Sequence, residues 1–188
     1  PETLPHADRS PWSLRAVASG LAAAAGERMA IVHALAAGCV FGALAVYIAV
    51  SEQLLGRAYG LGEGFVLAFG ALALFGSAGA FLSAAVVMRA GPRRVALLGR
   101  GVMLGLALVA SSAGRVWGAP PFWAFAAWAA ATFFCFGFVF GPLPAMAMQP
   151  LGAFAGLGSS LITSITLLMG GLCGLMLGAR YSDGPQAV

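Results

Sequence analysis

The feature that most constrains this chain is a stretch of 64 residues, 116–179, that contains no Asp, Glu, Lys or Arg. A water-soluble fold could not place such a stretch on its surface, which needs charged side chains. Residues 29–51 and 64–88 also lack these four residue types. Because the whole chain is 61% hydrophobic and only 9% charged, the sequence predicts a protein embedded in a bilayer.

A helix needs about 20 apolar residues to cross the hydrocarbon core. The apolar runs therefore predict an all-α fold, a polytopic bundle of five transmembrane helices over residues 29–179. Residues 1–28 are expected to form a cytoplasmic linker with an amphipathic stretch, and residues 180–188 an external loop in which the fragment ends. The expected spans are about 29–51, 64–88, 95–114, 122–146 and 155–179.

The same composition argues against several functions. The net charge of +4 comes from scattered arginines rather than from a basic face beside aromatics, so no nucleic-acid partner is expected. The three cysteines, Cys39, Cys135 and Cys173, have no C-x-x-C spacing and predict small buried hydrophobes, with no metal and no cofactor. The spans hold one histidine and no acid, which is too little for a membrane-embedded enzyme.

The arginines predict the orientation, because cytoplasmic loops carry an excess of positive charge. A cytoplasmic N-terminus puts seven arginines inside and three outside, so we expect that arrangement in the cell's inner (plasma) membrane. The seven are Arg9, Arg15, Arg28, Arg89, Arg93, Arg94 and Arg100, and the three are Arg57, Arg115 and Arg180.

Small residues and prolines mark the expected helix contacts. Gly38 and Gly42 have the GxxxG spacing that lets helices approach closely in lipid. In the fifth span, Gly170 and Gly174 lie on a small, hydroxyl-rich face opposite a leucine face, and we expect them to contact a neighbouring helix. In the fourth span, Gly137 and the pair Gly141-Pro142 predict a kink or break that could serve gating.

Several segments resemble one family. The turn Arg89-Ala90-Gly91-Pro92-Arg93-Arg94 resembles the cytoplasmic "DRxGRR" motif of the major facilitator superfamily, and Pro1-Glu2-Thr3-Leu4 resembles the "PETL" of its drug exporters. Residues 147–160, AMQPLGAFAGLGSS, resemble the helix ten to eleven segment of bicyclomycin-resistance-type multidrug efflux proteins, and residues 181–185 a motif after helix eleven. Two departures stand out: Gln149 replaces a frequent Glu, and no acid lies near Ala84 or Ala85.

The resemblance implies helices seven to eleven of a transporter whose other partner is an N-terminal six-helix half. It implies export of a small-molecule substrate, with the first and fourth spans lining the central cavity. The expected cavity residues are Phe41, Tyr47, Phe133, Phe136 and Phe140. Because the spans contain no Asp or Glu, the coupling acid of a proton antiporter is expected in the N-terminal half.

Alternatives remain at individual residues and for the whole chain. His33 is either a substrate or proton group or a satisfied interfacial histidine. Gly91 shapes the turn, while Arg89, Arg93 and Arg94 either set orientation or pair with a carboxylate or helix end across the loop. The chain itself is alternatively part of a metabolite or sugar transporter, or a membrane assembly subunit that transports nothing.

Overall fold

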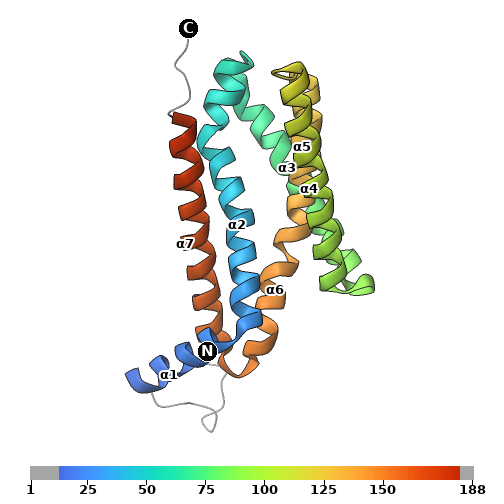
Figure 1. Cartoon of the computed structure of the whole chain (residues 1–188). Coiled ribbons are helices and arrows are strands. Elements are labelled where there is room, and N and C mark those ends of the chain that lie inside the picture. Colours follow the sequence, from blue (N-terminus) through green and yellow to red (C-terminus); the bar gives the residue numbers. More distant parts are fainter. Residues whose placement is uncertain (1–12, 183–188) are drawn as a thin grey trace.

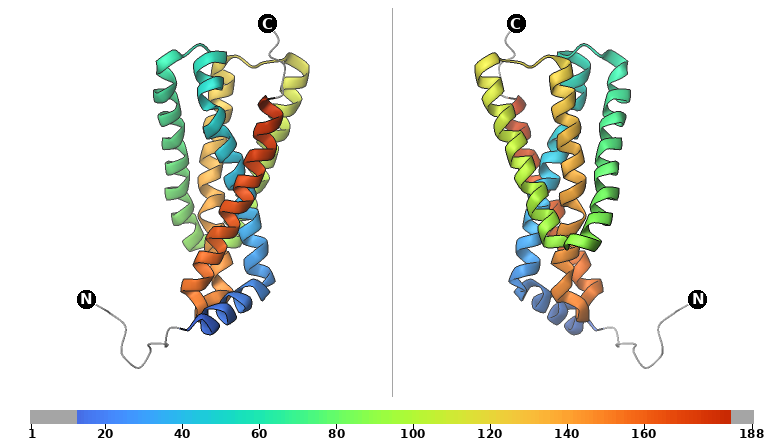
Figure 2. Two further views of the ribbon diagram at one scale, coloured as in Figure 1. Left: turned by 90° about the vertical axis from the view of Figure 1, so that its left-hand side faces the viewer. Right: turned by 90° about the vertical axis from the view of Figure 1, so that its right-hand side faces the viewer.

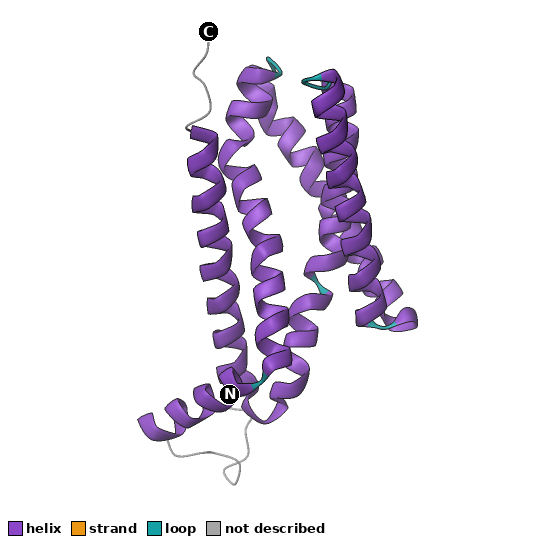
Figure 3. Cartoon of the chain, viewed as in Figure 1, coloured by secondary structure: helices purple, strands orange, loops and turns teal. Residues whose placement is uncertain are grey.

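The apolar runs fold as helices because backbone N–H and C=O groups in hydrocarbon must bond within the protein, which a helix achieves locally. The computed structural model describes residues 13–182, and no strand occurs among them (Figure 3). The predicted all-helical fold is confirmed at this level, whereas the Pro1–Leu4 motif and residues 183–188 lie outside the described residues. Five stretches are long and apolar enough to cross a membrane: Arg28–Ala58, Gly62–Ala90, Pro92–Trp117, Phe122–Gly152 and Ala155–Met176.

The helices run alternately up and down between two ends of the molecule, and the short helix α1 lies across the lower end (Figures 1 and 2). Their order is α1 (Leu14–Gly26), α2 (Arg28–Ser51), α3 (Phe65–Ala90), α4 (Pro92–Trp117), α5 (Phe122–Phe140), α6 (Pro142–Met148) and α7 (Ala155–Ser182). A 3₁₀ segment, Gln149–Phe154, joins α6 to α7.

The first span extends further than its charges suggested. The charges at Glu52, Arg57 and Glu63 led to expected spans of about 29–51 and 64–88 with a short loop between them, but α2 continues directly into a π-helical segment, Glu52–Ala58. Leu55 in that segment is buried, with 1% of its surface exposed. Glu52 and Arg57 project outward as an exposed ion pair, with Arg57 Nη2 3.5 Å from Glu52 Oε1. The expectation was wrong because a helix can bury its apolar face while its charges stay in water.

The Arg89–Arg94 turn is a compact helix-to-helix connection. Gly91 has φ +81°, a conformation that favours glycine, and its N–H bonds to the carbonyl of Val87 at the end of α3. Pro92 then occupies the first turn of α4, where its missing N–H costs nothing. These two residues reverse the chain between antiparallel α3 and α4 (Figure 2).

The bundle is organised around two extensively packed pairs, α2 with α7 and α3 with α5. Small side chains form much of the buried core, including Ala34, Ala37 and Ala96, which are fully buried. Large apolar side chains instead point outward: Phe81 is 82% exposed and Leu67 80%. This pattern is the reverse of that in a water-soluble protein. Because hydrocarbon solvates apolar groups, it suits helices that pack on each other through small side chains and contact lipid through large ones.

Candidate functional site

The α2–α7 pair is held by glycines at close backbone approach. A methyl group at Gly38 would lie 2.6 Å from Cβ of Met169, and one at Gly42 would lie 2.6 Å from Cβ of Cys173. From the other side, a methyl group at Gly170 would lie 2.5 Å from the Phe41 ring and 3.3 Å from the carbonyl oxygen of Gly38. The GxxxG spacing of the first span and Gly170 of the fifth thus meet in one contact.

The structure separates Gly170 from Gly174, which the sequence pattern treats alike. A methyl group at Gly174 would have no heavy atom within 4 Å, so this glycine makes no tight contact among the described residues. The neighbouring helix at Gly170 is α2, through Gly38, Phe41 and Gly42. Cys39, expected to be buried, is exposed on this pair.

Thr166 ties the same pair together by a hydrogen bond. Its buried hydroxyl donates to the carbonyl of Ala34 on α2 at 3.3 Å. Ser159 and Thr163, on the same small-residue side of α7, remain exposed, and the Ser159 hydroxyl donates to its own helix at the Gly156 carbonyl. Among residues 13–182, only part of the hydroxyl-rich face is therefore covered.

The α3–α5 pair depends on Gly79 and Gly137. A methyl group at Gly79 would overlap the carbonyl oxygen of Phe134, and one at Gly137 would overlap the carbonyl oxygen of Gly76. Gly137 lies inside the uninterrupted helix α5, which runs to Phe140. The missing side chain of Gly137 serves close packing against α3, and the helix is first interrupted one turn later, at Gly141-Pro142.

The fourth span is broken at Gly141 and Pro142, where α5 ends and α6 begins. Proline has no N–H to donate to the carbonyl four residues earlier, which is that of Phe138. The buried hydroxyl of Ser83 on α3 donates to this carbonyl at 3.3 Å. A neighbouring helix thus satisfies the backbone group that the proline leaves free, as a break inside a membrane requires.

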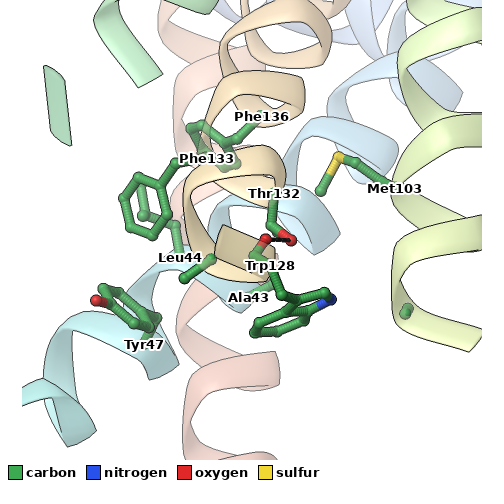
Figure 4. A pocket seen from close by; sticks show the side chains of 10 residues that line it. Ala43, Leu44, Tyr47, Met103, Trp128, Thr132, Phe133 and Phe136 are labelled. Atoms are coloured by element: carbon green, nitrogen blue, oxygen red, sulfur yellow. Dashed lines mark hydrogen bonds between the residues drawn. The ribbon is translucent and has the colours of Figure 1, made fainter. Parts of the chain in front are cut away.

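A cavity of about 280 Å³ lies between α2, α4 and α5 (Figure 4). Three of the five aromatic residues expected to line a cavity do so: Tyr47, Phe133 and Phe136. Its wall is almost wholly apolar. The remaining lining residues are Ala43, Leu44, Met103, Ala107, Trp128, Ala129 and Thr132.

The polar atoms of the cavity wall are mostly bonded to the backbone. Trp128 Nε1 donates to the carbonyl of Leu106 at 3.0 Å, and the Thr132 hydroxyl donates to the carbonyl of Trp128 at 2.8 Å. The Tyr47 ring contacts Phe133 edge-on and stacks on Phe69 of α3. Its hydroxyl points away from Trp128 in Figure 4 and is buried without a hydrogen-bond partner in the described part of the chain. The space itself offers a ligand apolar and aromatic contacts.

The other two expected cavity residues lie beside this space and not on its wall. Phe140 stacks on Phe136 with ring centroids 5.2 Å apart, and Phe41 lies 6.3 Å from Phe140. Phe41 also packs against Gly170 of α7. These rings therefore connect the cavity wall to the α2–α7 contact.

Two cavity-lining residues from α4, Met103 and Ala107, were not anticipated. The third span carries neither aromatics at this level nor any motif, so no sequence signal distinguished them. They line the cavity because α4 packs on α5, an arrangement that emerges only in three dimensions.

The remaining candidates lie at the lower end of the molecule. Arg89, Arg93 and Arg94 are exposed around the Gly91 turn. His33 Nδ1 donates to the Met29 carbonyl at 2.7 Å within α2. Gln149 is exposed at the start of the 3₁₀ segment. His33, Arg93 and Gln149 line a common crevice that is distinct from the aromatic cavity.

No protein-family model, no curated protein and no solved structure matches the chain. The resemblance to the major facilitator superfamily therefore has only the motifs quoted above as support.

Proposed function

We propose that the chain is the C-terminal part of a secondary active transporter of the major facilitator superfamily that exports drugs or other small lipophilic molecules. The aromatic cavity at Tyr47, Trp128, Phe133 and Phe136 is the observation that carries this proposal. Its walls suit lipophilic neutral or cationic compounds, since aromatic faces attract cations. A sugar or organic acid would need free polar groups, which this wall offers poorly.

The broken fourth span supports a transport role. Transporters commonly use interrupted helices near their binding sites, where freed backbone groups and bending serve conformational change. The break at Gly141-Pro142 follows directly on the aromatic segment that lines the cavity. Bending there would change the distance between the cavity wall and the lower end of the span.

An N-terminal six-helix half is the proposed partner, and α7 supports this part of the proposal. Ser159 and Thr163 are exposed on a helix suited to spanning the membrane. Hydroxyl groups facing hydrocarbon are unfavourable, so this face calls for a protein cover. Proton antiport would draw its titratable acid from the same half, because none of the five runs contains one within its apolar core.

We further propose that the end bearing α1 and the Arg89–Arg94 turn is cytoplasmic and that the protein resides in the inner (plasma) membrane. A single cysteine at position 93 in an otherwise cysteine-free full-length protein should resist an impermeant thiol reagent in intact cells and react after permeabilisation. A cysteine at position 60, at the opposite end, should show the reverse. Labelling of position 93 in intact cells contradicts the orientation.

The transport proposal is tested by filling the cavity. Ala43 lines the cavity but is exposed, so Ala43→Trp should occupy the space without overpacking a buried contact. Ala49→Trp adds the same ring to the same helix at an exposed position outside the lining residues. We expect full-length protein in energised vesicles to extrude the lipophilic cation ethidium, with Ala43→Trp slowing this by on the order of tenfold and Ala49→Trp matching the parent protein.

Two outcomes contradict this proposal. Absence of ethidium or other lipophilic export by the correctly inserted full-length protein would favour the assembly-subunit alternative. Equal transport by Ala43→Trp and the parent protein would remove the cavity from the transport path.

A further inference from the structure

The crevice lined by His33, Arg93 and Gln149 has a volume of about 390 Å³ and lies at the lower end of the bundle, between the starts of α2 and α4 and the end of α6. It is separate from the aromatic cavity and chemically different from it. Polar and basic groups from three helical segments converge on it. Its lining residues are Met29, His33, Pro92, Arg93, Leu97, Arg100, Met146 and Gln149.

The crevice has positive charge and no compensating acid among its described lining residues. Neither Arg93 nor Arg100 is ion-paired within residues 13–182. Arg100 uses Nε to bond the Ala96 carbonyl at 3.1 Å, which leaves its two terminal nitrogens free for a ligand. Gln149 adds an amide donor, and the beginning of α4 at Pro92 adds the positive end of a helix dipole.

His33 makes a conditional contribution. Its Nδ1 donates to the Met29 carbonyl, so its other ring nitrogen can donate to an anion only when the imidazole is protonated. The permanent donors are therefore Arg93, Arg100 and Gln149. Arginine in particular presents a forked set of N–H groups that matches phosphate oxygens.

The apolar rim of the crevice indicates where its ligand comes from. Met29 is 62% exposed and Leu97 55% exposed beside these donors. A soluble anion gains nothing from such side chains, whereas an acyl chain entering from the bilayer would cover them. The crevice also lies near the ends of spans Arg28–Ala58 and Pro92–Trp117, where lipid headgroups are found.

We propose that this crevice binds the phosphate of an anionic phospholipid, with Arg93 and Arg100 holding the headgroup and the acyl chains lying along Met29 and Leu97. Basic pockets between transmembrane helices are suited to anionic headgroups. The site gives Arg93 a role that Arg89 and Arg94 of the same turn do not share, because only Arg93 lines the crevice. The inference is independent of which substrate the aromatic cavity takes.

The test measures binding of fluorescent phosphatidylglycerol to the purified full-length protein in neutral detergent. Arg93→Gln and Arg100→Gln should each weaken binding about fivefold, as expected for one arginine at an anionic lipid. Arg89→Gln and Arg94→Gln are the matched controls, since they remove the same charge from the same turn. Each should change binding by less than about twofold, because neither side chain lines the crevice and an exposed charge that makes no direct contact contributes little.

A second variant keeps both arginines. Gln149→Glu places a negative charge on the crevice at an exposed position, so it should weaken phosphatidylglycerol binding while thermal unfolding without added lipid stays that of the parent protein. Unlabelled phosphatidylglycerol should compete, while phosphatidylcholine and soluble glycerol 1-phosphate should not. Competition by glycerol 1-phosphate at similar concentration overturns the lipid assignment. Equal losses in the Arg89, Arg93, Arg94 and Arg100 variants, or unchanged binding by Gln149→Glu, overturn the crevice as the site.

Discussion

The hydrogen bond from Ser83 to the Phe138 carbonyl is tested by coupling it to the proline that makes it necessary. Ser83→Ala removes the only side-chain donor described for this carbonyl, at 3.3 Å. Hydrogen bonds between membrane helices contribute about 0.6 kcal/mol on average and at most about 1.7. A long bond to the carbonyl that Pro142 cannot bond belongs between these values, so we expect Ser83→Ala to lower the free energy of unfolding by about 1 kcal/mol.

Pro142→Ala supplies the complementary change. It restores a backbone N–H that can bond to the Phe138 carbonyl within the helix, so the hydroxyl of Ser83 becomes redundant. In this background Ser83→Ala should cost close to nothing, which gives a coupling energy of about 1 kcal/mol in the double-mutant cycle. The cycle does not depend on what Pro142→Ala alone does to stability.

The measurement is reversible unfolding of the purified full-length protein in mixed micelles of increasing SDS content. Ser77→Ala is the matched control on α3, because the Ser77 hydroxyl is exposed and bonds only to its own helix at Ala73. It should leave the free energy of unfolding nearly unchanged. If Ser83→Ala costs the same with Pro142 and with Ala at that position, the hydroxyl acts through packing alone and the explanation of the break is wrong.

Three further results are expected. Gly42→Ala should lower the unfolding free energy by about 1–3 kcal/mol, because its methyl group would overlap Cys173 and force the helices apart. Gly171→Ala, which has open space around it, should leave the unfolding free energy unchanged, and equal effects of the two variants contradict the α2–α7 contact. Copper-phenanthroline should cross-link Cys39 to Cys173, because Cys173 packs against Gly42, which lies about one helical turn from Cys39 on α2. A protease cut between α2 and α7 should then leave one species on a non-reducing gel, and two fragments refute the proximity. Burial raises the pKa of Tyr59 above its usual value near 10, so stability should be retained below pH 10 and decline as pH rises through the folded-state pKa, with Tyr59→Phe flattening this decline.

The spans were predictable because membrane insertion reads composition along the chain. A run without charges must lie in hydrocarbon whatever its neighbours do, so five apolar runs indicated five helices. Helix ends were less predictable, as the segment Glu52–Ala58 shows. Its charges indicated water, and they are exposed, but Leu55 is buried and the helix continues. A charge therefore reports the depth of a residue and not the end of its helix.

Helix partners were harder to predict than helix positions. Gly170 and Gly174 have the same spacing relation to the hydroxyl-rich face, yet only Gly170 meets α2 closely. Gly137 suggested a kink, because it precedes Gly141-Pro142 by one turn, but its close contact with α3 was not predicted. A glycine pattern shows that a close approach is possible, and the identity of the approaching helix comes from tertiary packing.

The candidate cavity was predictable to the extent that its walls are aromatic. Tyr47, Phe133 and Phe136 carry large rings on spans that could face a common space, and all three line it. Met103 and Ala107 of α4 complete the wall but have no distinguishing chemistry, since methionine and alanine are common at any apolar helix position. The basic crevice was missed for a related reason, because His33, Arg93 and Gln149 are far apart in sequence.

The break in the fourth span has a structural explanation in the two helix pairs. Above the break α5 packs along α3, and below it α6 packs mainly on α2, while α5 itself contacts α2 much less (Figure 1). A straight helix would have to continue in the direction set by α3 and could not also pack on α2. The interruption at Gly141-Pro142 lets one span belong to both pairs, and Ser83 satisfies the carbonyl exposed by that change of partner. Since glycine contacts hold each pair closely, bending at this interruption is the motion that would move one pair against the other with the least disruption of packing.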